Sequence, residues 1–148
     1  MGGNPAENHP ISFRWLTKAK EKGGKIVSVD PRFTRTSSKA DVYASLRSGT
    51  DIAFMGGMIN YALENNLIHR EYVAEYTNAS FIVKKDFEFD DGLFSGYDEA
   101  TRKYDKTKWA FETDEEGNPK KDKTLTHPRS VFQLMRKHFS RYDVDSVI

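Results

Sequence analysis

The sequence predicts an α/β fold with a mostly parallel sheet. Three observations lead to this fold class: a glycine-rich turn at residues 2–10, a helical pattern at 10–22, and a short β-branched segment at 25–30. This order is typical of a crossover unit, in which a helix connects two parallel strands with right-handed geometry. The first strand of such a unit would precede Met1. We therefore expect the chain to begin inside a larger domain.

Composition limits the function classes that are open to the chain. Its 148 residues are enough for one domain with a modest core. Because 23 basic and 22 acidic residues leave a net charge of +1, we expect no nucleic-acid partner. The absence of cysteine excludes disulfides, thiolate nucleophiles and cysteine-ligated iron–sulfur clusters from this segment. No targeting signal is visible, and no apolar run approaches the roughly 20 residues of a membrane span, so direct membrane insertion is not expected.

The first half of the chain supplies the elements of this α/β part, which we assign to residues 1–83. Apolar residues recur at helical spacing in 10–22, and the glycines at 23–24 end that helix. Pro31 prevents the strand at 25–30 from continuing, because proline cannot donate to a ladder. A helical turn is predicted around 37–41, followed by a brief strand or extended segment at 42–46.

A longer helix is predicted from Thr50 or Asp51 to about residue 65, where either side chain can cap the free amides. Glycines inside a helix cost about 1 kcal/mol each relative to alanine, so Gly56 and Gly57 predict close packing against another backbone. A second helix is expected at 69–76. The apolar face of the longer helix should comprise Ile52, Met55, Ile59, Ala62 and Leu63.

Periodicity disappears between residues 84 and 126, which we interpret as an irregular insertion or an interface segment. Within it, 108–113 and 123–125 are expected to pair across a turn near Gly117. A final helix is predicted from His127 to about residue 142, before the chain end at 148.

Three segments would fall beyond the carboxyl ends of the parallel strands, where α/β proteins bind ligands. They are 2–9, 30–36 and 49–51. In the first segment, the amides of Gly2, Gly3 and Asn4 can meet phosphates, as in other glycine-rich turns that precede a helix. The side chains of Glu7 and Asn8 can meet polar groups of the same ligand.

The other two segments extend the prediction to a nucleotide. Asp30 stands at a strand end, where an acidic side chain commonly accepts hydrogen bonds from ribose. Arg32 and Arg35 are suited to flank a phosphate or a base. The carboxylate of Asp51 matches the paired N1–H and amine donors of guanine.

Each of these assignments has a purely structural alternative. Gly2 and Gly3 are compatible with a simple tight turn, Asp30 with a strand terminator, and Asp51 with a helix cap. The four histidines, at positions 9, 69, 127 and 138, have no metal-ligand spacing, so solvated or capping roles are expected. No pattern indicates a catalytic triad.

Several motifs in this order resemble the molybdopterin oxidoreductases, and more closely the large, catalytic subunit of respiratory formate dehydrogenases. The motifs are Gly2-Gly-Asn-Pro-Ala-Glu-Asn-His-Pro10, Val29-Asp-Pro-Arg-Phe-Thr-Arg-Thr36, Ala40-Asp41 and Arg47-Ser-Gly-Thr-Asp51. The resemblance continues through 70–80, 91–98 and His127-Pro-Arg129, and so covers almost the whole chain.

The resemblance implies a three-layer αβα, Rossmann-like dinucleotide-binding domain and a bis(molybdopterin guanine dinucleotide) cofactor with molybdenum or tungsten. It also implies formate oxidation to carbon dioxide, with electrons leaving through iron–sulfur clusters. The first segment would contact one pterin dinucleotide, the second would line its nucleotide, and the third would hold its guanine end. The residues concerned are Gly2, Gly3, Asn4, Glu7, Asn8 and His9, then Asp30, Pro31 and Arg32, then Gly49 and Asp51.

The same resemblance places the catalytic groups elsewhere: the metal-bound cysteine or selenocysteine and the cluster domain upstream, and the active-site arginine downstream. We therefore expect a partial cofactor-binding domain that is catalytically silent alone. Its partners would be the remainder of the catalytic subunit, an iron–sulfur electron-transfer subunit and a membrane cytochrome subunit, with the parent enzyme in the periplasm. Two alternatives stay open, a free-standing nucleotide- or cofactor-binding protein and a non-enzymatic interaction module.

Overall fold

The computed structural model describes residues 1–90 and 92–147. Asp91, which begins the motif at 91–98, and Ile148, which ends the chain, lie outside the described residues. The chain divides into two compact units, Met1–Met55 and Gly56–Ile148. Among the helices of the described residues, none combines the length and apolar character needed to cross a membrane.

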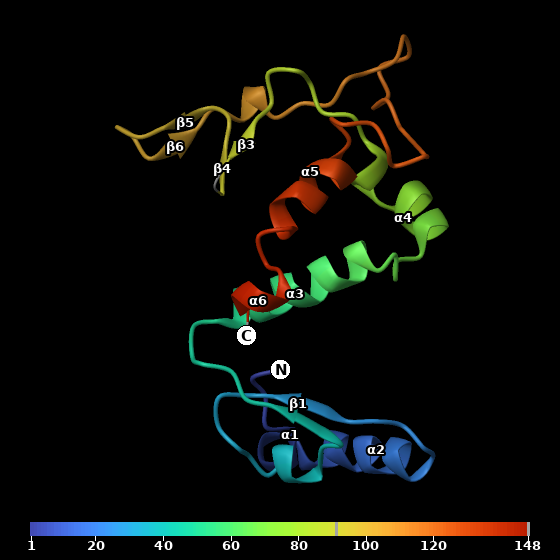
Figure 1. The fold of residues 1–148 in the computed structure, drawn as a ribbon, viewed down its shortest axis with the longest axis vertical. Helices are drawn as coiled ribbons and strands as arrows, with labels where there is room; N and C mark the ends of the chain where they lie inside the picture. Colours follow the sequence, from blue (N-terminus) through green and yellow to red (C-terminus); the bar gives the residue numbers. More distant parts are fainter. Residues whose placement is uncertain (91, 148) are drawn as a thin grey trace. The chain divides into compact units, whose positions relative to one another are not determined.

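The first unit contains a pair of parallel strands and, before them in the chain, the helix that was predicted at 10–22 (Figure 1). Strands β1 (Val27–Val29) and β2 (Val42–Ala44) pair in parallel, with Val27 opposite Val42 and Val29 opposite Ala44. The predicted helix at 10–22 and the two predicted strands are confirmed. The helical elements of this unit before residue 51 are α1 (Pro5–Asn8), α2 (Pro10–Glu21) and η1 (Ser37–Lys39).

Helix α2 exposes the apolar side chains that its periodicity marks as a packing face. Ile11 is 81% exposed and Trp15 is 65% exposed. Lys18 Nζ lies 4.8 Å from the centre of the Trp15 ring, where the cation can interact with the face of the ring. The helical spacing of the apolar residues is therefore confirmed, but α2 has no buried residue in the structure.

The interior of the first unit is polar. Ser28 of β1 and Ser37 of η1 are buried, with their hydroxyl oxygens 2.9 Å apart. The Thr34 hydroxyl lies 3.0 Å from that of Ser37 and accepts from the Ser37 amide. Because buried hydroxyls need partners, this network fixes the segment after β1 against the strand.

Asp41 joins the entry of β1 to the start of β2. Its carboxylate accepts a 2.8 Å hydrogen bond from the Ile26 amide and lies 3.3 Å from Lys20 Nζ. The backbone hydrogen bond, followed by the nearby lysine, lowers the pKa of Asp41. Asp41 is thus a structural carboxylate that sets the register of the parallel pair.

The second unit is built around packed helices. Helix α3 (Asp51–Glu64) spans the junction of the units, and α4 (Arg70–Tyr76), η2 (Asn78–Ser80), α5 (Val131–Phe139) and α6 (Val144–Val147) follow. The core of the unit consists of Leu63, Ala74, Ala79, Leu125 and Phe132. On α3, Gly56, Asn60 and Leu63 are buried, whereas Ile52 and Met55 of the predicted apolar face are exposed.

The helix boundaries follow recognisable capping chemistry. His69 Nδ1 accepts from the Tyr72 amide at the start of α4, which confirms a capping role for this histidine. Ser130 accepts from the Gln133 amide at the start of α5. The last predicted helix therefore begins at Val131 rather than at His127, because Ser130 supplies the better cap.

Gly56 and Gly57 confirm the prediction of close packing on α3, with one difference in what they contact. A Cβ at Gly56 would lie 2.6 Å from the Tyr142 ring, and one at Gly57 would lie 3.3 Å from Val147. The neighbours are side chains rather than a backbone. The glycines let the aromatic ring of Tyr142 sit directly on the helix surface.

The predicted insertion at 84–126 contains two short antiparallel hairpins. Strands β3 (Phe89–Asp90) and β4 (Leu93–Phe94) form the first, and β5 (Tyr97–Asp98) and β6 (Lys103–Tyr104) form the second, before η3 (Lys106–Lys108). The expected pairing of 108–113 with 123–125 is wrong. Instead Thr113 pairs with Pro119, and Val83 pairs with Phe111.

Leu125 does not pair as a strand, because the Asp122 carboxylate folds residues 122–127 into a turn. Asp122 accepts hydrogen bonds from the amides of Thr124, Thr126 and His127 at 3.0, 2.7 and 2.6 Å. Leu125 adopts a φ of +58° and is 1% exposed, so it enters the core instead of a strand. The hydroxyl of Thr124 and these amides lower the pKa of Asp122 to about 2.

Within the described residues, the sheets are three separate pairs, one parallel and two antiparallel. The parallel β1–β2 pair is compatible with a mostly parallel sheet, but it is a different pair from the predicted crossover, which stays a prediction. The three-layer αβα arrangement requires further strands and stays a prediction.

Candidate functional site

The first two predicted ligand segments begin at one edge of the parallel pair in the first unit. The Gly2 amide donates to Val29 O at 2.9 Å, and the Asp30 amide donates to Ala44 O at 3.2 Å. Residue 2 and the carboxyl ends of β1 and β2 therefore lie together. Since β2 ends at Ala44, the segment leading to Gly49 leaves from the same edge. This is the edge at which open α/β sheets bind ligands.

The glycine turn has open space on its outer side. Gly2 has a φ of +62°, and no atom lies within 4 Å of the positions that a Cβ would take at Gly2 or Gly3. The Gly2 amide is bonded within the protein, whereas the Gly3 and Asn4 amides have no partner among the described residues. Gly3 and Asn4 are thus the amides of this turn that remain available to an anion.

The Asn4 side chain is turned into the protein. Asn4 is 9% exposed, and its Oδ1 accepts from the Thr36 hydroxyl at 2.9 Å and from the Thr36 amide at 3.3 Å. The Thr36 hydroxyl in turn accepts from the Ala6 amide at 3.0 Å. Asn4 therefore ties the first segment to the end of the second, which leaves its backbone rather than its side chain to face a ligand.

Glu7 is also engaged within the protein, whereas its two successors are open. The Glu7 carboxylate accepts from Asn4 Nδ2 and lies 3.2 Å from Arg35 Nε. Asn8 and His9 are exposed, and the His9 carbonyl accepts from Ser12 and Phe13 in the first turn of α2. The predicted ligand contacts of Glu7, Asn8 and His9 stay predictions.

Asp30 is buried at the end of β1 and keeps part of its carboxylate unused. Its Oδ1 accepts from the Arg32 amide at 2.9 Å, which closes a turn across Pro31. Its Oδ2 has no partner among the described residues. The Asp30 carbonyl accepts from the Tyr43 hydroxyl at 2.9 Å, so strand β2 helps to fix this carboxylate. The Arg32 side chain is exposed beside it.

The third segment leads into a helix N-terminus. Gly49 has a φ of +87° with open space around it, and Thr50 donates through its hydroxyl to Arg47 O at 2.6 Å. The amides of Asp51, Ile52 and Ala53 have no hydrogen-bond partner within the described part of the chain. The Asp51 carboxylate is exposed in the first turn of α3.

These residues fit the phosphates and polar edges of a nucleotide. The Gly3 and Asn4 amides have no hydrogen-bond partner among the described residues, Asp30 Oδ2 can accept hydroxyl hydrogens, and the exposed Asp51 carboxylate can accept from a base. Within the same described ranges, no group of three or more metal-ligating side chains lies together.

Sequence reasoning missed Thr36 as the residue that joins the first two segments. Thr36 is 6% exposed and bonds both Asn4 and Ala6 across about thirty positions of sequence. A threonine in a Thr- and Ser-rich stretch carries no local signal for such a role. Asn4 and Thr36 lie in two different motifs of the family resemblance, and neither motif by itself indicates that the two side chains pair.

Comparison with known proteins gives matches along the full chain, although no family model matches it. The chain is 63% identical over 147 residues to the formate dehydrogenase subunit alpha of Megalodesulfovibrio gigas, covering 99% of this chain and 14% of that protein. It is 56% identical over 148 residues to the nitrate-inducible formate dehydrogenase major subunit of Escherichia coli (strain K12), covering 99% and 15%.

A shorter match is 39% identical over 77 residues, to the F420-dependent formate dehydrogenase subunit alpha of Methanocaldococcus jannaschii, covering 52% of this chain and 11% of that protein. The chain thus spans 14–15% of the length of the relatives that it matches throughout. It resembles a segment of formate dehydrogenase alpha or major subunits.

Proposed function

We propose that this chain is a segment of a formate dehydrogenase large subunit and supplies part of its bis(molybdopterin guanine dinucleotide) site. The identity of 50–63% along the chain to alpha and major subunits supports the assignment to that subunit. When bound, the molybdenum or tungsten of the cofactor provides the redox chemistry that converts formate to carbon dioxide. The residues of this chain hold and orient the dinucleotide.

One observation carries the cofactor-binding role: loops that are distant in sequence begin at the same edge of the β1–β2 pair. The Gly2–Val29 and Asp30–Ala44 hydrogen bonds fix this arrangement. Next to these bonds, the Gly3 and Asn4 amides and the Asp30 carboxylate are left with unused hydrogen-bonding capacity. A pyrophosphate with an attached ribose requires donors and an acceptor of this kind.

The guanine end is assigned to Gly49 and Asp51. Gly49 needs its positive φ to turn the chain into α3, and an absent side chain leaves room for a base. Asp51 offers a carboxylate for the N1–H and amine donors of guanine. Arg32 and Pro31 complete the proposed lining of the nucleotide, with Arg32 as the counter-charge for phosphate.

We place the catalytic groups in other parts of the large subunit, so the chain alone is expected to be inactive toward formate. Iron–sulfur clusters, an electron-transfer subunit and a cytochrome partner would complete the enzyme, which we propose to be periplasmic. The name of one relative, formate dehydrogenase 2 subunit alpha (cytochrome c-553) of Nitratidesulfovibrio vulgaris, includes a cytochrome.

The test is the cofactor content of a large subunit that carries this segment with Asp51→Ala. Loss of hydrogen bonds to a charged group should weaken binding of the guanine dinucleotide by about 1.5–3 kcal/mol. Guanine nucleotide released per subunit on acid treatment measures retention after dilution. The matched control is Glu99→Ala, which removes an exposed carboxylate in the turn between β5 and β6. Equal guanine content and affinity in the two variants would contradict the assignment.

A further inference from the structure

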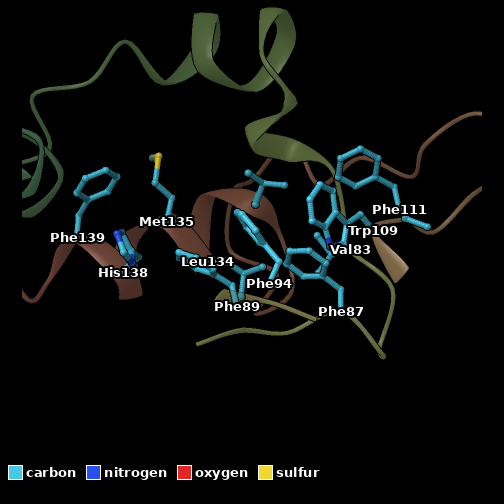
Figure 2. Close-up of a pocket in the computed structure, with 12 residues that line it drawn as sticks. Val83, Phe87, Phe89, Phe94, Trp109, Phe111, Leu134, Met135, His138 and Phe139 are labelled. Carbon is cyan, nitrogen blue, oxygen red and sulfur yellow. The ribbon is translucent and has the colours of Figure 1, made fainter. Parts of the chain in front are cut away.

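The second unit contains an apolar cavity of about 310 Å³. It lies between α5 and residues 83–111, which include both hairpins and which we call the hairpin segment. Figure 2 shows the rings of Phe87, Phe89 and Phe94 opposite Leu134 and Met135 of α5. Trp109 closes a further side. A cavity of about 150 Å³ already accommodates benzene in other proteins, so this one has room for a large apolar group.

The walls of the cavity are held in place by contacts within the unit. The Phe89 ring stacks on Phe94 at 4.8 Å between centres, and it lies 4.8 Å from the His138 ring. Trp109 Nε1 donates to Ser95 O at 2.9 Å, which fixes the indole. The concavity is therefore built by rings that already have partners, rather than by loose side chains.

The cavity offers almost no polar group to an occupant. The Val83 amide donates to Arg129 O at 3.0 Å, and the Val83 carbonyl accepts from Arg129 Nη1 at 2.7 Å. The Ala110 carbonyl accepts from Lys84 at 3.0 Å. His138 Nδ1 is enclosed without a partner among the described residues. Burial, and then the charge of Arg141, lower the pKa of His138, which favours the neutral form of its ring.

Apolar side chains that line the cavity, or that neighbour its lining in the sequence, are partly exposed. Of the lining residues, Phe94 is 39% exposed and Trp109 36%; in the two hairpins, Leu93 is 50% exposed and Tyr97 38%. A concavity surrounded by exposed aromatic and aliphatic groups is typical of a protein contact site, in which an anchor residue fills the centre.

The chemistry of the lining favours a polypeptide over a small molecule. Small-ligand sites carry a few polar groups that fix the orientation of the ligand, and the groups above are already satisfied or enclosed. A side chain needs no such groups, because its own backbone orients it. The relatives extend far beyond the matched segment, which spans 14–15% of their length, so they contain ample chain to cover this surface.

We propose that this cavity receives an uncharged apolar side chain, such as leucine, methionine or phenylalanine, from a part of the large subunit outside these 148 residues. The proposal rests on the assignment of the chain to a large subunit. It makes the hairpin segment a contact surface between parts of the subunit, and gives Phe94 and Trp109 the role of its central contacts.

The first test measures access to the cavity with N-phenyl-1-naphthylamine, a neutral probe that fluoresces in apolar surroundings. The 148-residue chain should bind the probe, and Leu134→Trp, which fills the cavity, should weaken binding at least tenfold. Leu67→Trp, at an exposed position between α3 and α4, should leave binding unchanged. The intact large subunit should not bind the probe at this site. Failure of the chain to bind, an unaffected Leu134→Trp variant, or equal binding by the intact subunit would each overturn the proposal.

The second test identifies the occupant by photo-crosslinking in the intact enzyme. p-Benzoylphenylalanine at position 93 should crosslink to a large-subunit peptide outside the 148 residues, and the same group at position 67 serves as the control. A crosslink to another subunit or to a second copy would overturn the proposal. Guanine content of the same preparations separates the two ideas, because the crosslink at position 93 is independent of whether Asp51 binds the dinucleotide.

Discussion

Asn4→Ala is the substitution that tests most sharply how the first ligand segment is positioned. Asn4 Oδ1 accepts from the Thr36 hydroxyl at 2.9 Å and from the Thr36 amide at 3.3 Å. Both residues are buried, so the alanine variant leaves two enclosed donors without an acceptor. Each such loss costs about 1–3 kcal/mol, and the hydroxyl can partly recover by rotation. We expect the first unit to lose about 2–4 kcal/mol of unfolding free energy.

The chain contains two tryptophans, which makes the two units separable in a urea titration. Trp15 lies on α2 in the first unit and Trp109 lies in the second, so a Trp109→Phe background reports on the first unit alone. Asn8→Ala is the matched control, because it removes the same type of side chain from an exposed position of the same segment. An unfolding free energy of Asn4→Ala within about 0.5 kcal/mol of the parent, or an equal loss in Asn8→Ala, would contradict this role of Asn4.

Three further predictions concern the second unit. Asp122→Asn should cost about 1–2 kcal/mol at pH 7 after allowance for solvent screening, because its carboxylate has a pKa of about 2 when folded. Since this pKa is depressed, the stabilisation by Asp122 is present above about pH 4 and is lost as the pH falls through about 2. The urea midpoints of the variant and the parent should therefore converge at low pH, and a difference that stays constant with pH would contradict this prediction. Gly56→Ala should destabilise by about 1–3 kcal/mol in thermal unfolding, because its Cβ would lie 2.6 Å from the Tyr142 ring, and an unchanged midpoint would refute this packing. Because burial lowers the pKa of His138, the parent should lose stability as the pH falls below about 6.5. His138→Leu should not show this loss, and equal pH profiles of unfolding in the parent and the variant would count against the burial of His138.

Local chemistry allowed much of the first unit to be predicted from the sequence. The glycines at 23–24 and Pro31 delimit α2 and β1, and the two short β-branched segments pair in parallel, which is compatible with a mostly parallel sheet. The alignment of the loops at one sheet edge follows from that topology. The role of Asn4 could not be predicted in the same way, because a side chain that contacts Thr36 depends on tertiary structure rather than on spacing.

Periodicity was less informative where packing partners decide burial. The helical pattern of α2 is correct, yet Ile11 and Trp15 are exposed in this unit. In the insertion at 84–126, the segment 123–125 was expected to pair as a strand, but Asp122 folds that stretch into a turn and Leu125 enters the core. A carboxylate that accepts several amides can override a weak strand pattern, since it satisfies the same backbone donors that a ladder would.

The central claim is that the edge of the β1–β2 pair holds a pterin guanine dinucleotide. Amide hydrogen exchange, compared between a cofactor-loaded and a cofactor-free large subunit that carries this segment, tests it most directly. The account predicts slower exchange in the loaded protein at Gly3, Asn4 and residues 51–53, with no change in the exposed turn at 114–118. Equal exchange at Gly3 and Asn4 in the two preparations would contradict it.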